Sequence, residues 1–268
     1  MDSSTLTALF EQIQAEAPAI ATRELLEAAA GRKCSRVELG AAGLDRLADL
    51  SRAFGFGLSV GRQKVIVVPQ PHKGDWADGT VEFVPTEDPR GYFAAYLGPT
   101  EQAAEMARDA EEFLGDDAFG ELLGIPACCR AFYRHYREVA LATGDDYLPW
   151  TLSASGPGPH PAGANICAQY FDSALLGYYP CSLSCISTRE RSARTLTWLQ
   201  KVAPALAVTM ETGHRSSYIV VPGVGMARLQ SDEVEAVLGA LSCAVAAELW
   251  SSRSADIDAF VIEISDGW

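Results

Sequence analysis

The hydrophobic residues at the start of the chain recur mostly at intervals of three and four residues. This spacing extends from residue 5 to residue 30 and is typical of helices that bury one face. Pro18 interrupts the stretch, and because proline cannot continue a helix, we expect two helices rather than one. The same spacing returns from Gly43 to Phe54, and Gly55 is a natural helix end. The pattern therefore predicts three helices in this region.

Strand-like segments lie between and after these helices. They are rich in β-branched and aromatic residues, and they span Arg36–Leu39, Leu58–Val68, Thr80–Val84 and Tyr92–Leu97. The segment 69–79 is rich in proline, glycine and charged residues, which predicts a loop. Helices and strands in this order favour an α+β fold, in which a small mixed sheet is covered by helices. Residues 1–98 are accordingly assigned to an N-terminal α+β region.

Helical patterns dominate the remainder of the chain. Pro99 and Thr100 mark the start of one helix, and Cys128–Leu141 predicts another that is rich in aromatic residues. The segment Thr151–Gly163, rich in proline, glycine and serine, predicts a long loop that covers a site. The other predicted elements are helices at Asn165–Leu176, Cys181–Val202 and Glu233–Trp250, a hairpin of Tyr218–Val221 and Met226–Leu229, and a strand at Phe260–Ile264. Residues 99–268 are assigned to this cysteine-bearing helical region with a C-terminal hairpin and helix, or to one domain continuous with the first.

Composition narrows the range of partners. The chain has 268 residues, of which 48 % are hydrophobic, and its formal net charge is −14, so its surface repels phosphate backbones. We therefore expect no nucleic-acid partner, and we interpret Arg189, Arg191 and Arg194 with Lys201 as a solvated basic face of a helix. The sequence has no run of 18 apolar residues and no signal-peptide core at its start, which predicts a cytoplasmic protein without a membrane partner.

Two pairs of cysteines suggest the chemistry of the protein. Cys128 and Cys129 follow Pro126, and Cys181 and Cys185 follow Pro180. Because proline is favoured in the first turn of a helix, each pair is expected at a helix start, where unpaired N–H groups stabilise thiolates. A chain of this size needs no disulfides for stability, so four activated thiols indicate a metal or redox site.

Helical geometry distinguishes between the two candidate cofactors, a single metal ion and an iron–sulfur cluster. On a helix, Cys181 and Cys185 would point the same way one turn apart and could share one metal ion. Cys128 and Cys129 would diverge by about 100°, an arrangement that an iron–sulfur cluster accepts more easily than a single ion. The pattern thus favours an iron–sulfur cluster, [4Fe–4S] in particular, with zinc as the alternative cofactor. Two other interpretations stay open, namely buried core thiols and a thiol–disulfide redox pair.

Other residues are candidates by position. Arg130 and Arg189 each follow a cysteine pair and would hold an anionic substrate, while His214, flanked by charged residues, would transfer a proton. Cys167 is a fifth candidate ligand, and Asn165 could also reach the site. The remaining thiols and histidines have the following expected roles: Cys34 and Cys243 in the core, His72 and His135 on the surface, and His160 as a base or ligand within the predicted cover.

The segments GIPACCRAFY (124–133) and PCSLSC (180–185), with Asn165 between them, resemble a little-characterised prokaryotic family. Members of this family carry a G-x-P-x-C-C-x-x-F/Y motif followed by a P-C-S-x-x-C motif. The resemblance covers residues 124–185 and implies that the four cysteines act together. It implies no particular reaction.

The sequence as a whole predicts an iron–sulfur enzyme that acts on a small anionic metabolite. The reaction would be a lyase or dehydration step at an open iron, or a transfer of sulfur or electrons that needs a donor protein as partner. The alternatives are a zinc-stabilised binding protein without catalytic activity and a thiol-redox protein.

Overall fold

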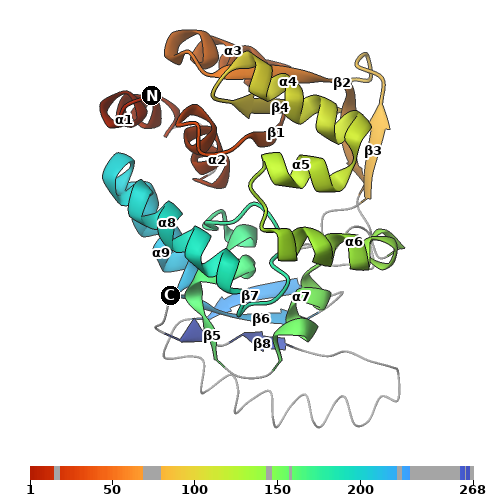
Figure 1. Ribbon diagram of the computed structural model, residues 1–268, viewed down its shortest axis with the longest axis vertical. Helices are drawn as coiled ribbons and strands as arrows, with labels where there is room; N and C mark the ends of the chain where they lie inside the picture. The colour runs from red at the N-terminus through yellow and green to blue at the C-terminus, as the bar shows by residue number, and fades with distance from the viewer. Residues whose placement is uncertain are drawn as a thin grey trace.

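The computed structural model describes residues 1–14, 19–68, 80–142, 147–156, 159–221, 225–229, 260–262 and 264–265. In Figure 1 a four-stranded sheet and the helix of residues 101–109 that follows it lie in the upper half of the molecule, and the helices of residues 127–214 lie below. The α+β class is confirmed. The predicted loop 69–79 with His72 lies outside the described residues, and so do Cys243 and the predicted helix Glu233–Trp250.

The N-terminal elements agree closely with the hydrophobic pattern. They are α1 (Ser3–Ile13), α2 (Ala19–Ala29), β1 (Ser35–Leu39), α3 (Ala41–Phe54), β2 (Gly57–Val68), β3 (Thr80–Val84) and β4 (Tyr92–Gly98). Gly55 ends α3 in the left-handed conformation, with φ of 73°, which glycine adopts without steric cost. The sheet order is β1–β4–β2–β3, and all three pairings are antiparallel.

The central strand β4 buries both of its faces. Ala95 and Leu97 pack into a core with residues of α1, α2 and α3, whereas Ala94 and Tyr96 contact the helices on the opposite face. Those helices are α4 (Glu101–Asp109) and α5 (Asp116–Leu122), joined by the π-helical turn η1 (Ala110–Leu114). Because side chains alternate along a strand, one short strand supports two layers of helices.

The rest of the chain forms a second, mainly helical part. Its elements are α6 (Ala127–Ala142), α7 (Leu148–Ser155), β5 (His160–Pro161), η2 (Ala162–Ala164), η3 (Ile166–Phe171), α8 (Ile186–Val202), α9 (Pro204–His214), β6 (Ser217–Val221), β7 (Gly225–Leu229), β8 (Phe260–Ile262) and β9 (Ile264–Ser265). The predicted hairpin is confirmed as β6 and β7, and β8 adds a third antiparallel strand. Strand β9 pairs with β5 in parallel.

The predicted loop and one of the predicted helices in this part are wrong. The predicted loop Thr151–Gly163 begins inside α7, because Pro149 stands in the first turn of that helix and favours it. The predicted helix Asn165–Leu176 is only the 3₁₀ helix η3, which ends at Asp172 with φ of 51°. The chain after Asp172 therefore leaves the helix and forms an irregular segment, residues 173–185.

The largest hydrophobic cluster draws on both parts of the chain. It joins Leu9, Leu26 and Leu97 to Leu199 and Met210 of α8 and α9. The proposed boundary at residue 98 thus crosses a common core, and the division into two regions stays a prediction. A second cluster lies around α6, α7 and the 173–185 segment, and it includes Cys129 and Cys185, with Cys181 packed against it.

Candidate metal centre

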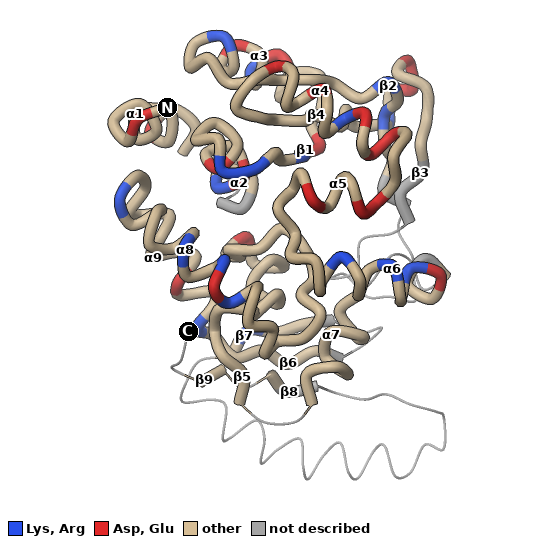
Figure 2. The backbone as a smooth tube through the Cα atoms, in the orientation of Figure 1, with Lys and Arg blue, Asp and Glu red and all other residues tan. Residues whose placement is uncertain are grey.

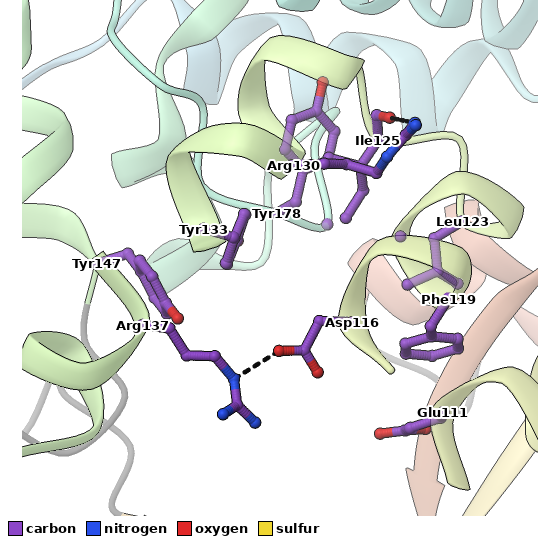
Figure 3. Close-up of a pocket in the computed structure, with 12 residues that line it drawn as sticks. Glu111, Asp116, Phe119, Leu123, Ile125, Arg130, Tyr133, Arg137, Tyr147 and Tyr178 are labelled. Atoms are coloured by element: carbon purple, nitrogen blue, oxygen red, sulfur yellow. Dashed lines mark hydrogen bonds and ion pairs between the residues drawn. The ribbon is translucent and has the colours of Figure 1, made fainter. Parts of the chain in front are cut away.

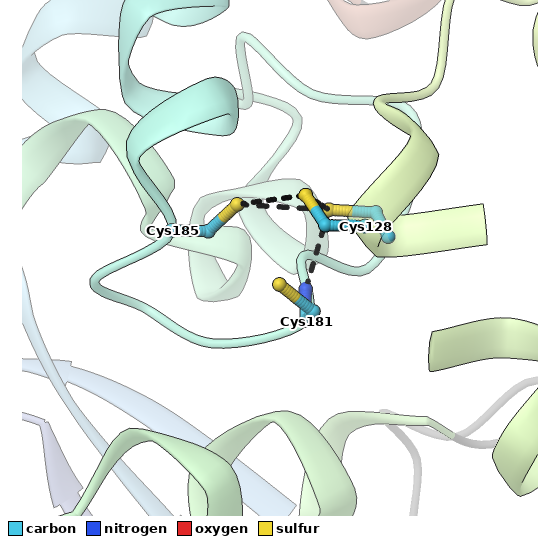
Figure 4. A group of neighbouring side chains, drawn as sticks. Cys128, Cys181 and Cys185 are labelled. Atoms are coloured by element: carbon cyan, nitrogen blue, oxygen red, sulfur yellow. Dashed lines mark hydrogen bonds between the residues drawn. The ribbon is translucent and has the colours of Figure 1, made fainter. Parts of the chain in front are cut away.

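The four cysteines of the two sequence motifs lie together. The Sγ atoms of Cys128, Cys129, Cys181 and Cys185 are all within 4.8 Å of one another. Cys185 Sγ is 3.7 Å from Cys128 Sγ and 3.8 Å from Cys129 Sγ, and the sulfurs of the adjacent pair are 3.9 Å apart. Figure 4 shows the side chain of Cys128 from the start of α6 and that of Cys185 from the chain just before α8 converging, with Cys181 beside them. This group of four sulfurs could hold a metal ion.

Helix α6 supplies the first pair from its first turn, as the sequence predicts. The Arg130 N–H bonds to the Pro126 carbonyl and closes that turn at 2.9 Å. Cys128 is exposed and Cys129 is buried. Both cysteines lie in the first turn of α6, where the unpaired N–H groups of a helix start favour negative charge.

The second pair departs from the prediction. Cys181 lies in the irregular segment before α8, and Cys185 is the residue that precedes the first helical residue, Ile186. The two sulfurs therefore converge through a turn, in which the Cys185 N–H donates to the Ser182 carbonyl at 3.1 Å. A helix from Cys181 onward does not form because other elements bind this backbone.

Helix α7 provides those bonds. The Thr151 hydroxyl donates to the Pro180 carbonyl at 2.7 Å, and the Leu183 N–H donates to the Ser155 hydroxyl at 2.8 Å. Both side chains come from the segment predicted to be a covering loop. Residues 151–155 of that segment are helical, and their hydrogen bonds hold the turn that carries Cys181.

A threonine and a tyrosine support the sulfurs, and sequence reasoning missed both. Thr188 Oγ1 lies 3.4 Å from Cys129 Sγ, and the Tyr178 hydroxyl donates to Thr188 Oγ1 at 3.2 Å. The Cys181 N–H also donates to Cys129 Sγ, at 3.4 Å. The i,i+3 spacing of Cys185 and Thr188 on a predicted helix was the available signal, since residues so spaced share a face.

The thiols differ in how readily they ionise. The pKa of Cys185 is lowered because Cys129 and Thr188 donate hydrogen bonds to its sulfur. The pKa of Cys129 is raised because its proton is held in the bond to Cys185 and because the residue is buried. Burial and Cys185 also raise the pKa of Cys181. One negative charge is thus stable in the group, and further thiolates would repel it without a cation.

The other cysteines stand apart from this group. Cys167 is fully buried in the same hydrophobic cluster, but it is not among the four converging sulfurs. Burial raises its pKa, as expected for a core thiol. Cys34 is buried beside α4, where its sulfur donates to the Ala103 carbonyl at 3.5 Å.

The two arginines proposed to hold substrate have different surroundings. Arg130 binds Asp117 at 3.0 Å through Nε and the Ile125 carbonyl at 3.0 Å through Nη1. Arg189 begins the second turn of α8, where its N–H donates to the Cys185 carbonyl at 3.0 Å. The charge of Arg130 is already compensated by an acidic residue. Substrate binding by either arginine stays a prediction.

His214 is fully buried at the end of α9, away from the sulfur group. Its Nε2 accepts the Leu175 N–H at 2.7 Å, and its Nδ1 lies 2.8 Å from the Ala162 carbonyl. Burial lowers its pKa to about 4, so the ring is neutral at pH 7. The Asn165 amide donates to the His214 and Ser216 carbonyls at 3.0 Å each. These contacts give both residues a structural role, and proton transfer by His214 stays a prediction.

The other two histidines in the described part of the chain, His135 and His160, do not join the cysteines. His135 is exposed on α6, as predicted, and its ring lies 4.6 Å from that of Tyr136. His160 is buried in β5, and burial lowers its pKa. Among the described residues, the potential metal ligands that gather are the four cysteines alone.

A pocket of about 330 Å³ adjoins α6 on the side of Arg130, Tyr133 and Arg137. Figure 3 shows Arg137 of α6 facing Asp116 of α5 across its mouth, and their ion pair measures 2.6 Å. Tyr178, which reaches the sulfurs through Thr188, forms part of its wall. The pocket is therefore polar and aromatic, with its arginines balanced by acidic residues.

Comparisons with known proteins give no guide to these residues. The chain matches no protein-family model, no curated protein and no solved structure. The chemistry of the four cysteines is therefore the main indication of function.

In the described part of the chain, no helix combines the length and the apolar character that crossing a bilayer requires.

Proposed function

We propose that the protein binds one tetrahedrally coordinated metal ion, zinc, through Cys128, Cys129, Cys181 and Cys185. The observation that carries this proposal is the spacing of the sulfurs, 3.7, 3.8 and 3.9 Å in the three measured pairs. Four thiolates bound to one zinc at about 2.3 Å form a tetrahedron whose edges are about 3.8 Å long. The separations among Cys128, Cys129 and Cys185 match that edge, and the sulfur of Cys181 lies within 4.8 Å of all three.

The same distances are less compatible with the [4Fe–4S] cluster that the sequence favours. In such a cluster each thiolate binds a different iron at a corner of the cube, so the thiolate sulfurs lie farther apart than the ligands of one ion. The argument for a cluster assumed that Cys128 and Cys129 diverge too widely to share an ion. Their sulfurs are 3.9 Å apart, which removes that objection.

A thiol–disulfide pair is also less well supported. A redox pair brings two sulfurs together in preference to others, because the bond length is only about 2.05 Å. Here Cys185 is nearly equidistant from Cys128 and Cys129, at 3.7 and 3.8 Å. Convergence of several sulfurs on one point, without a preferred pair, is the arrangement of ligands around an ion.

Charge supplies a further argument. The pKa of Cys185 is lowered, whereas the pKa values of Cys129 and Cys181 are raised by burial and by the neighbouring sulfur. A divalent cation reverses this balance, because thiolate ligands lose their protons on coordination. Bound zinc would then join the start of α6, the 173–185 segment and the start of α8 in a site of structural type.

A catalytic use of the ion is a second candidate. It is favoured by the exposure of Cys128, which leaves one ligand open to solvent. Catalytic zinc sites have three protein ligands and an open position, so displacement of one cysteine would admit a substrate. The pocket walled by Tyr178 would then hold the small molecule. A partner protein that donates sulfur or electrons would be needed only if the site held an iron–sulfur cluster.

Metal analysis of anaerobically purified full-length protein tests the proposal. We expect about one zinc per chain and a colourless sample, because zinc has no d–d transitions. The Cys185→Ser variant should lose the metal, whereas the Cys34→Ala variant, which alters a thiol outside the group, should retain it. A brown sample that contains iron and sulfide would instead support the cluster, and a sample without metal whose thiols titrate reversibly would support the redox pair.

A further inference from the structure

A second polar cavity lies where the end of α2 faces the middle of α8. Its volume is about 310 Å³, and it is lined by Glu27, Arg32, Arg191, Arg194 and Thr195. In Figure 2, Lys and Arg residues mark both the chain after α2 and the first half of α8. Three guanidinium groups thus meet around one carboxylate in a chain whose net charge is −14.

The carboxylate of Glu27 is already engaged by other groups. It is fully buried, its Oε2 lies 2.5 Å from Arg23 and 3.4 Å from Lys33, and its Oε1 accepts the Thr195 hydroxyl at 3.2 Å. Burial alone would raise its pKa, but Lys33 and Arg23 lower the value to about 2. Glu24 also pairs with Arg23 at 2.9 Å and with Lys33 at 3.5 Å, so the carboxylates of Glu24 and Glu27 together balance these two cations and leave the three arginines of the cavity in excess.

Within the described residues, none of those arginines is fully compensated by an acidic side chain. Arg191 donates to the carbonyls of Gly124 and Leu123, which carry no charge. Arg194 pairs with Glu190 at 3.8 Å, and both side chains are about two-thirds exposed to solvent, so water weakens the attraction. The positive charge of the cavity thus remains available to a ligand.

Arg32 is the most informative of the three. Its guanidinium stacks on the ring of Trp198 at 4.8 Å, and among the described residues it forms no hydrogen bond or ion pair through that group. Burial lowers its pKa, the nearby Glu27 raises it, and Arg191 and Arg194 lower it further. Stacking fixes the orientation of the guanidinium without consuming its N–H donors, which is how arginine is often held for recognition of an anion.

From this arrangement we propose that the cavity binds the phosphate group of a small molecule through Arg32, Arg191 and Arg194. Arginine donates two parallel hydrogen bonds to an oxyanion, and three converging arginines complement a phosphate dianion better than a single carboxylate. A solvated basic face would spread its charges along one helix. Here Arg32 comes from a separate element and closes the cavity against α8. The proposal does not depend on which metal the cysteines bind.

Calorimetric titration of the metal-loaded full chain with inorganic phosphate tests the proposal. We expect saturable binding that weakens by roughly tenfold or more in Arg32→Gln and in Arg194→Gln, because each substitution removes a charged donor. Both residues are exposed, so neither substitution should unfold the chain. Lys201→Gln, which removes one positive charge at the exposed end of α8, is the matched control and should leave binding unchanged.

Three outcomes would overturn the proposal. The first is an absence of saturable phosphate binding by the wild-type chain. The second is equal weakening in the Lys201→Gln control, which would mean that only the general charge of α8 matters. The third is binding of a short oligonucleotide without binding of inorganic phosphate, which would make the basic face a nucleic-acid surface.

Discussion

The Thr188 hydroxyl on α8 lies 3.4 Å from the sulfur of Cys129 on α6. Thr188 also accepts a hydrogen bond from Tyr178, so the contact belongs to a chain of polar groups that runs through a hydrophobic cluster. The sulfur group is therefore held by residues that do not themselves bind a metal. Such outer contacts orient the ligands and tune their affinity.

Substitution of Thr188 tests that role. We expect Thr188→Val to weaken zinc affinity by about 10- to 100-fold, because loss of an outer-shell hydrogen bond typically has an effect of this size. Thr188→Ser keeps the hydroxyl and should stay close to the wild type. Competition with a zinc chelator of known affinity measures both. Equal affinity in Thr188→Val and the wild type would mean that the contact does not support the site.

Removal of the metal should destabilise the fold. The four cysteines connect α6, the 173–185 segment and α8, and a ligand that binds only the folded state stabilises it by mass action. We expect chelation to lower the Tm by roughly 5–10 °C, which corresponds to a few kcal/mol for a chain of this size. Scanning calorimetry with and without chelator measures the shift. A Cys185→Ser chain, already without metal, should show no further decrease.

His214 should make stability depend on pH. Its pKa is about 4 in the folded protein, against an ordinary value of 6.5, so the unfolded chain binds more protons between these values. Stability is then complete above pH 6.5 and falls as the pH decreases toward 4. At about 1.4 kcal/mol per pH unit, the loss approaches about 3 kcal/mol.

Urea unfolding at pH 7 and pH 5 measures that contribution. The His214→Gln variant should be less stable at pH 7, because the bonds to Leu175 and Ala162 are disturbed, and its stability should change less between the two pH values. His135→Gln replaces an exposed histidine and is the control for the general effect of losing one imidazole. A pH dependence identical to that of the wild type would exclude His214 as its source.

The buried pair of Arg23 and Glu27 should be essential for stability. Arg23 is 1 % exposed and lies 2.9 Å from Glu24 and 2.5 Å from Glu27. Arg23→Met leaves the buried carboxylate with Lys33 as its nearest cation, and breaking such a pair typically costs about 3–5 kcal/mol. Arg52→Met, at an exposed ion pair, should change stability by less than about 1 kcal/mol. Chemical unfolding of both variants measures the loss of unfolding free energy. Equal losses in the two variants would contradict the claim that the buried ion pair matters more than the exposed one.

The elements that the sequence predicted well are those governed by local periodicity. Helices α1 to α3 and strands β1 to β4 lie within a few residues of their predicted bounds, because side-chain spacing along one segment determines which face it can bury. The burial of both faces of β4 was not predictable in the same way. It depends on the two helical layers that pack against Ala95 and Tyr96.

The four candidate ligands could also be read from the sequence, since paired cysteines in a chain of this size indicate shared chemistry. The distances between their sulfurs could not be predicted from the sequence. Cys181 was predicted on a helix, but bonds from Thr151 and Ser155 of α7 hold its segment in a turn. These bonds join residues about 30 positions apart, and no local pattern reveals them.

By itself, the sequence thus determined the α+β class, most of the elements and the identity of the clustered thiols. Tertiary structure alone decided the separations of 3.7–3.9 Å among the sulfurs of Cys128, Cys129 and Cys185, on which the proposal of a single ion rests. It also decided the meeting of Arg32 with Arg191 and Arg194, which come from distant parts of the chain. The physical reason is the same in both cases. Residue type sets what chemistry a side chain can perform, whereas distances between remote side chains arise only when the helices that carry them pack together.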